Sequence, residues 1–144
     1  MLKIYEWETD TYPEFILASL KSCEAEKLLR KLVRHFKTCP VRLTFRGYGF
    51  VGGAYGHNSR RISLPHFTSL SSVCHEFAHH LADTRHQKTC GHRKEFKREL
   101  KRVYTYAKRW LPEKRLHQMQ YGGTSGEQTN SESTGLSVEK KEVV

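Results

Sequence analysis

The sequence lacks the features that define several classes of protein. No two of its four cysteines are spaced as a CxxC pair, so a zinc ribbon built on cysteines is not expected. Its apolar runs are only a few residues long, too short for a transmembrane helix. The first 20 residues contain four acidic side chains, so they lack the apolar stretch of a secretory signal peptide. We therefore expect a cytoplasmic protein with no disulfides and no membrane contact.

The length of 144 residues fits one domain, and a hydrophobic content of 37% is enough for a modest core. Residues 119–144 are rich in Gly, Ser, Thr and Glu and have little periodic apolar pattern. We predict a disordered tail there and a single folded domain over residues 1–118. A monomer is the default expectation.

Charge is distributed unevenly along the chain. The formal net charge is +10, and residues 121–144 contribute −2, so residues 1–120 carry +12. A body this basic favours an acidic partner, with nucleic acid as the first candidate. A simply solvated basic surface explains the charge equally well at this point.

Apolar periodicity predicts three helices. Residues 23–37, 69–83 and 92–110 each place apolar side chains on one face at the 3.6-residue spacing of a helix. Residues 1–21 contain aromatic and aliphatic side chains that need cover, but their pattern defines no element boundaries.

The segment between the first two helices changes to a strand pattern. Residues 41–45 alternate apolar and polar side chains, and residues 50–55 and 61–64 are two further short strands separated by turn residues. We predict a short three-stranded antiparallel meander. Together with the helices it makes an α+β fold.

The helix over 69–83 contains the pattern HExxH, formed by His75, Glu76 and His79. Residues at i and i+4 lie one turn apart on one helix face, so both imidazoles can reach one metal ion. Glu76 is placed to act as a general base on water rather than as a ligand. Composition alone gives roughly 0.05 chance matches to this pattern. The motif therefore predicts one zinc ion per chain.

A hydrolytic zinc needs a third protein ligand and one open position. His92 is the best candidate, because the loop before it lets the chain turn back towards the helix. Cys90 and Glu95 remain alternatives. Asp83 is too far along the helix axis to be a ligand and fits better as a hydrogen-bond acceptor for a ligand imidazole.

These residues predict a zinc-dependent metalloendopeptidase. In this mechanism Glu76 takes a proton from a zinc-bound water, which attacks the peptide carbonyl, and then passes the proton to the leaving amine. A substrate strand is expected to pair along residues 50–55, where Gly52 and Gly53 leave space beside Tyr55. A plain bulge or turn is the other explanation for the two glycines. Tyr55 and His80 are the candidates for stabilising the oxyanion.

The segment HEFAHHLADTRHQKTCGHRKEFKREL resembles the core motif of SprT-like (Spartan-type) zinc metallopeptidases. That family combines HExxH, a short loop and a third histidine followed by Phe and basic residues, here His92, Phe96 and Lys97. The residue after His92 is Arg93, where the family usually has glycine. The resemblance implies a small zincin-like fold, without the zinc ribbon of bacterial relatives, and protein substrates that are held on DNA.

The helix over 92–110 is strongly basic outside its apolar stripe. Residues 85–118 hold 12 Lys and Arg against 3 Glu. Such a face is able to follow a phosphate backbone, and a solvated helix face is the alternative. The candidate nucleic-acid contacts are Lys94, Lys97, Arg98, Lys101 and Arg102. A second hypothesis is therefore a basic nucleic-acid-binding module in which zinc is only structural.

Overall fold

The computed structural model describes residues 2–47, 52–87, 91–111 and 142–143. In these ranges the fold is α+β, with five helices, a two-stranded sheet and a four-stranded sheet. The helices are α1 (Leu2–Thr11), α2 (Pro13–Leu17), α3 (Ser22–Phe36), α4 (Leu70–His86) and α5 (Lys94–Ala107). The strands are β1 (Ser19–Lys21), β2 (Arg42–Arg46), β3 (Ala54–Gly56), β4 (Arg61–Pro65), β5 (Phe67–Ser69) and β6 (Glu142–Val143).

Helices α3, α4 and α5 are the three that periodicity predicts. Helix α4 begins after Ser69, whose side chain accepts a hydrogen bond from the backbone N–H of Ser72 at 3.0 Å. Helix α3 begins after Lys21, whose backbone N–H donates to the Glu24 carboxylate at 2.9 Å. Both α3 and α4 end at a residue in the left-handed conformation, Lys37 and Gln87 respectively.

The predicted antiparallel meander is wrong in its pairing. The order in the larger sheet is β3-β4-β2-β6, and β2 runs parallel to β4, with Leu43 opposite Ile62. Strand β3 pairs antiparallel with β4. The reason is burial: Ile62, Ser63 and Leu64 are all buried, so β4 takes the central place and β3 becomes an edge.

Two residues of the predicted disordered tail form a strand. Glu142 and Val143 form β6 and pair antiparallel with Leu43 and Arg42 of β2, although the sequence predicts disorder through the end of the chain. The remainder of the predicted tail, residues 119–141 and 144, lies outside the described residues. The predicted strand over 50–55 is described only from residue 52, and β3 begins at Ala54.

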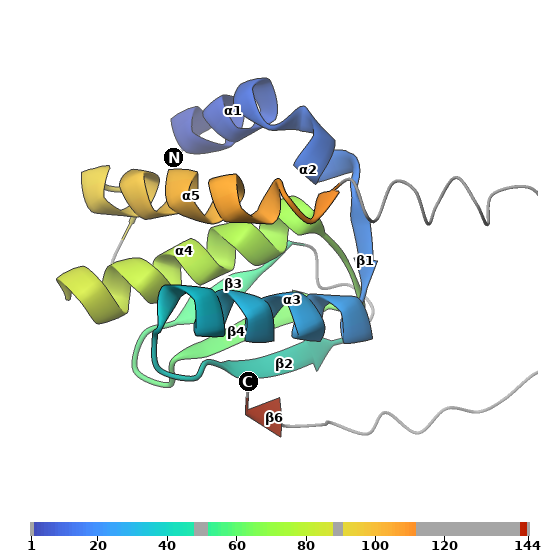
Figure 1. The fold of residues 1–144 in the computed structure, drawn as a ribbon, viewed down its shortest axis with the longest axis vertical. Helices are drawn as coiled ribbons and strands as arrows, with labels where there is room; N and C mark the ends of the chain where they lie inside the picture. The colour runs from blue at the N-terminus through green and yellow to red at the C-terminus, as the bar shows by residue number, and fades with distance from the viewer. Residues whose placement is uncertain (1, 48–51, 88–90, 112–141, 144) are drawn as a thin grey trace, which may run out of the picture.

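The core is built where the helices meet the sheet. Helix α4 lies between the larger sheet and α5, and α1 lies on the other side of α5 (Figure 1). The largest buried side chains come from the helices and from both sheets: Phe15, Leu20, Leu28, Leu29, Leu32, Ile62, Leu64, Leu70, Phe77, Leu81, Phe96 and Tyr104. This packing holds α4 rigidly on both sides and so fixes the direction of the HExxH side chains.

Candidate active site

Three histidines converge beside the middle of α4. His75 and His79 come from α4, and His92 comes from the residues just before α5. One ring nitrogen from each lies within 4.8 Å of the other two, so the group is able to hold a metal ion. The structure therefore brings together the three side chains that the sequence selects as ligands. Glu95 is not part of this group, and Cys90 lies outside the described residues.

The spacing of the nitrogens fits a small cation. The Nε2 atoms of His75 and His92 face each other at 3.0 Å. A tetrahedral zinc with Zn–N bonds of about 2.0–2.1 Å sets neighbouring nitrogens about 3.3 Å apart. Phe96, which is buried, packs on all three rings with centroid distances of 5.0, 4.3 and 4.9 Å. The three rings therefore rest on a common apolar floor.

Burial favours the neutral form of two of the three imidazoles, His79 and His92. Desolvation lowers the pKa of His79 to about 3, and the charges of His75 and His92 act in the same direction. Desolvation also lowers the pKa of His92, with His75 contributing. At neutral pH these two side chains are therefore neutral, as metal coordination requires.

The N-terminal helix supplies a partner for the first histidine. His75 donates from Nδ1 to Oε2 of Glu8 at 2.9 Å, which leaves its Nε2 directed at the histidine group. The other Glu8 oxygen accepts from the Tyr104 hydroxyl at 2.6 Å, and that hydroxyl lies 2.9 Å from Ser71 Oγ. Glu8 is only 3% exposed and Tyr104 is fully buried. Carboxylates in this position fix the tautomer and orientation of metal-ligating histidines.

This finding corrects the expectation for Asp83. Asp83 accepts a hydrogen bond from the Tyr55 hydroxyl at 2.8 Å, and Glu8 takes the role expected of Asp83 beside His75. The Tyr55 hydroxyl also lies 3.2 Å from Nδ1 of His80, whose Nε2 donates to the Cys39 carbonyl at 3.0 Å. His80 is fully buried. Tyr55 and His80, the two candidates for stabilising the oxyanion, thus form hydrogen bonds that connect α4 to β3 and to Cys39.

Glu76 borders a cleft beside the histidines. The cavity measures about 360 Å³ and is lined by residues of α1, α2 and α4 together with Gly52, Gly53 and Ser69. Tyr5 is half exposed there and stacks on His75 at 5.2 Å. Of the residues predicted to bind substrate, Gly52 and Gly53 line this cleft, whereas Tyr55 is not among its lining residues.

The Glu76 carboxyl is 7% exposed. Burial raises its pKa to about 7, with His75 acting to lower it and Glu8 to raise it. A carboxyl that titrates near neutral pH is suited to take up and release a proton. The side chain that the motif selects as general base is thus buried next to His75 at the edge of the cleft.

The glycine before β3 makes room for this carboxylate. A Cβ atom at Gly53 would lie 2.7 Å from Cγ and 3.0 Å from Oε1 of Glu76. Gly52 has a φ of +82°, a conformation that side chains rarely adopt. The two adjacent glycines therefore allow the backbone to approach the Glu76 side chain closely. This role differs from both explanations offered by the sequence, which were space for a substrate strand and a simple bulge or turn.

Gly53→Ala is expected to displace the Glu76 carboxylate without disturbing the histidines. A shift of about 1 Å in a catalytic group costs about 100-fold in rate. We expect kcat of any hydrolytic activity to fall by about that factor while zinc affinity is unchanged. Gly47→Ala is the matched control, because a Cβ there meets nothing within 4 Å. Equal rates for the two variants would show that contact with Gly53 does not set the position of Glu76.

The five cations selected as nucleic-acid contacts do not share one face. The Lys97 and Lys101 ammonium groups lie over the Trp7 ring of α1, at 4.7 and 5.7 Å from its centroid. Arg102 points to the other side of α5, where it pairs with Glu99 at 3.2 Å. Lys94 and Arg98 are exposed.

Comparison with known proteins gives no match: no family model, no curated protein and no solved structure matches the chain. Among the described residues, no helix is both long enough and apolar enough to cross a bilayer.

Proposed function

We propose that this chain is a zinc-dependent endopeptidase of the SprT-like type. The observation that carries the proposal is a group of three converging imidazoles on a buried floor, with the carboxylate of Glu76 beside them at the edge of a cleft. Three histidines leave one position of a tetrahedral metal free, which is the arrangement of catalytic rather than structural zinc sites.

The residues divide the chemistry between them. Zinc, when bound, supplies Lewis acidity towards water and towards the substrate carbonyl. Glu76 accepts the proton of the attacking water and donates it to the amine that leaves. Glu8 holds His75 in the tautomer whose Nε2 faces the metal position. Phe96 and Tyr5 shield the histidine rings from solvent on two sides.

A peptide substrate has an edge strand to pair with. Within the described residues, β3 pairs with β4 alone, so its outer edge has no partner strand. Gly53 lies directly before this strand and lines the cleft next to Glu76. An extended peptide added along β3 would present its carbonyl groups to the site by β-augmentation. The resemblance stated above favours proteins bound to DNA as substrates.

The competing hypothesis is a structural zinc in a basic binding module. A structural site has four protein ligands and contributes directly to folding. The metal-binding group among the described residues has three members, and the hydrophobic core also includes residues of the other helices and of the sheet that do not contact it. The buried Glu76 also has no purpose in a purely structural site. These observations favour the peptidase.

Removal of zinc is the experiment that separates the two hypotheses. The full chain is stripped with a chelator and then given one equivalent of zinc, and cleavage of an unfolded labelled protein is followed together with far-UV circular dichroism. We expect cleavage to vanish and return while the helical signal persists. A basic DNA-binding protein, with and without DNA, is the second substrate. Loss of the helical signal with the metal, and no cleavage in any condition, would contradict the proposal.

A further inference from the structure

The N-terminal helix brings a phenol to the cleft beside Glu76. Tyr5 of α1 lines this cleft together with Glu76 and His75, and it is half exposed. Its ring stacks on His75 with the two planes 12° apart and meets the His92 ring edge-on at 5.5 Å. Phe96 packs on the same two histidine rings but is buried and does not line the cleft. Tyr5 therefore covers these rings from the cleft side.

The contact between Glu8 and His75 also sets the position of Tyr5. Residues three apart on a helix lie on the same face, so the hydrogen bond from His75 to Glu8 holds Tyr5 over that histidine as well. Desolvation raises the pKa of the Tyr5 phenol, and the charges of Glu76 and Glu8 act in the same direction. The hydroxyl therefore carries its proton at neutral pH, and it is close enough to Glu76 for the charge of that carboxylate to act on it.

The other hydroxyl groups of the cleft lining already have hydrogen-bond partners within the protein: those of Thr9, Ser69, Ser71 and Ser72. Among the described residues, none forms a hydrogen bond with the Tyr5 hydroxyl. Tyr55, which the sequence offers for the oxyanion, donates to Asp83 and does not line the cleft. Tyr5 is therefore the side chain of this lining whose hydroxyl is available to a ligand.

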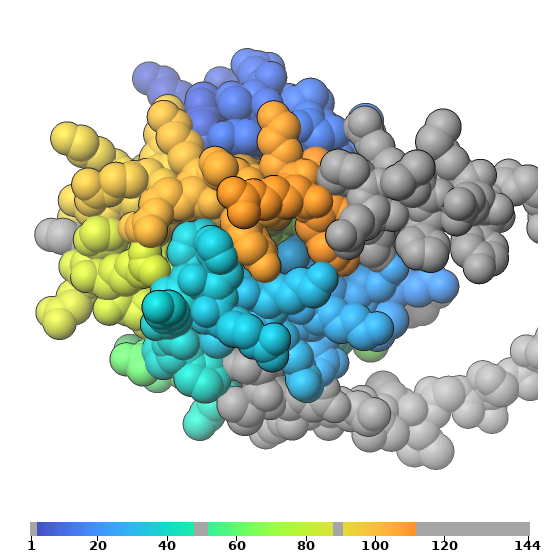
Figure 2. Space-filling view, in the orientation of Figure 1, coloured from blue at the N-terminus to red at the C-terminus, as the bar shows by residue number. Residues whose placement is uncertain are grey.

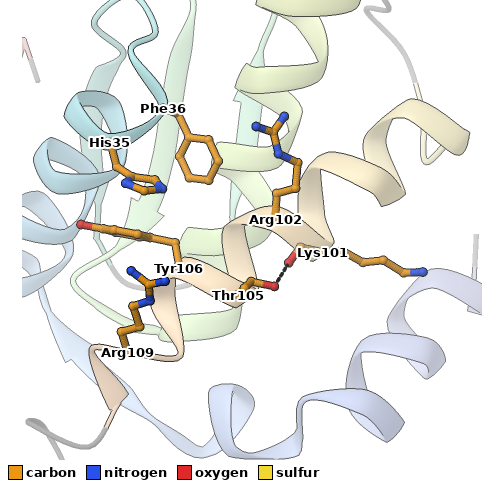
Figure 3. Close-up of a pocket in the computed structure, with 7 residues that line it drawn as sticks. All are labelled: His35, Phe36, Lys101, Arg102, Thr105, Tyr106 and Arg109. Carbon is orange, nitrogen blue, oxygen red and sulfur yellow. Dashed lines mark hydrogen bonds between the residues drawn. The ribbon is translucent and has the colours of Figure 1, made fainter.

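A second cavity contains a tyrosine that is covered on both faces. On the face shown in Figure 2, side chains of α5 lie between those of α1 and those of α3. The second cavity lies between α3 and α5 and measures about 290 Å³ (Figure 3). Its tyrosine, Tyr106, stacks on His35 at 4.0 Å, and Arg109 lies on the other side of the ring. This cavity shares no lining residue with the cleft, so Tyr106 serves as a control for Tyr5.

We propose that the Tyr5 hydroxyl donates a hydrogen bond to the oxyanion that forms when water adds to the peptide carbonyl, an inference that rests on the peptidase proposed above. The water oxygen bonds to the carbonyl carbon, the π electron pair moves to the carbonyl oxygen, and Glu76 holds the proton released. When the C–N bond breaks, that electron pair restores the carbonyl and the proton passes to the nitrogen. Tyr5 keeps its own proton throughout and acts as a fixed donor aimed at the developing charge.

Tyr5→Phe tests this role because it keeps the ring on His75 and removes only the donor. Loss of one such donor typically lowers kcat about 100- to 1,000-fold. We expect a fall of that size in cleavage of a labelled unfolded protein, with KM and zinc affinity unchanged. Tyr106→Phe also loses one phenol hydroxyl, but away from the cleft, and should cleave at the wild-type rate.

A second readout does not depend on turnover. A peptide phosphinate carries an anionic tetrahedral centre that resembles the oxyanion, and its affinity for the zinc-loaded full chain is measured by calorimetry. A hydrogen bond to a charged group contributes about 1.5–3 kcal/mol, so Tyr5→Phe should weaken phosphinate binding about 10- to 150-fold. An uncleaved substrate peptide bound to the Glu76→Gln chain has no oxyanion, and adding Tyr5→Phe should leave its affinity unchanged.

The outcomes separate this role from the proposed function. Equal kcat and equal phosphinate affinity in Tyr5→Phe and Tyr106→Phe would refute the role of Tyr5 and leave the peptidase intact. A parallel fall in zinc affinity would show that Tyr5 supports the histidine rings instead. If the wild-type chain binds the phosphinate without cleaving the protein, the affinities of the two variants decide the role of Tyr5. If it does neither, the proposed function and this inference fail together.

Discussion

Glu76→Gln is expected to lower kcat for peptide cleavage by about 100- to 10,000-fold, the usual contribution of a positioned general base. The amide has nearly the shape of the carboxylate, so it fits beside Gly53, but it cannot take a proton from water. The three imidazoles are untouched, and zinc affinity should therefore stay at the wild-type value. The measurement is steady-state cleavage of a labelled unfolded protein, with zinc content determined on the same samples.

A neighbouring carboxylate provides the control for this experiment. Glu95 lies between His92 and Phe96 in the sequence but is outside the metal-binding group. Glu95→Gln should retain near wild-type cleavage. If Glu76→Gln cleaved as fast as Glu95→Gln, the assignment of the base would be wrong, even with one zinc bound per chain.

The second large effect concerns a residue far from the motif. Glu8→Ala removes the acceptor for His75 Nδ1–H and leaves the Tyr104 hydroxyl without its 2.6 Å partner. Loss of such a carboxylate typically costs about 10- to 100-fold in metal affinity. We expect zinc affinity, measured by competition with a chromophoric chelator, to fall by that factor. Glu8→Gln should recover part of it, because the amide oxygen still accepts from His75.

The control for Glu8 comes from the same helix. Glu6 is exposed on α1, so Glu6→Ala should leave zinc affinity unchanged. Tyr104→Phe keeps the ring in the core and removes only the hydroxyl, so its effect should be smaller than that of Glu8→Ala. Wild-type zinc affinity in Glu8→Ala would show that the contact with His75 does not position the ligand.

Local spacing was sufficient to predict the metal-binding group. The i, i+4 pair His75 and His79 follows from helical periodicity, and His92 follows from the short loop that reverses the chain. The contribution of Glu8 could not be predicted, because it lies 67 residues from His75. It is also one of three acidic residues near each other in α1, and only its buried position distinguishes it from Glu6 and Asp10.

The pairing of the strands in the larger sheet could not be predicted from the sequence either. Alternation identified β2, and the turn residues around residues 61–64 identified β4, but neither pattern says which strands become neighbours. The pairing was decided by burial of β4 from both sides, which left β3 at the edge next to Glu76. The basic composition of α5 was likewise readable from the sequence. Tertiary packing decides that Lys97 and Lys101 lie over the Trp7 ring, whereas Arg102 pairs with Glu99 on another side of the helix.

The central claim is that three histidines bind one zinc and leave a position open for chemistry. X-ray absorption at the zinc edge of the full chain, reconstituted with one equivalent of metal, tests it directly. A catalytic zinc held by His75, His79 and His92 should show three imidazole nitrogens and one exchangeable oxygen donor, and His92→Ala should lose one of the nitrogens. A sulfur donor or a fourth protein ligand would indicate a closed structural site, and failure to retain zinc would contradict the metal centre itself.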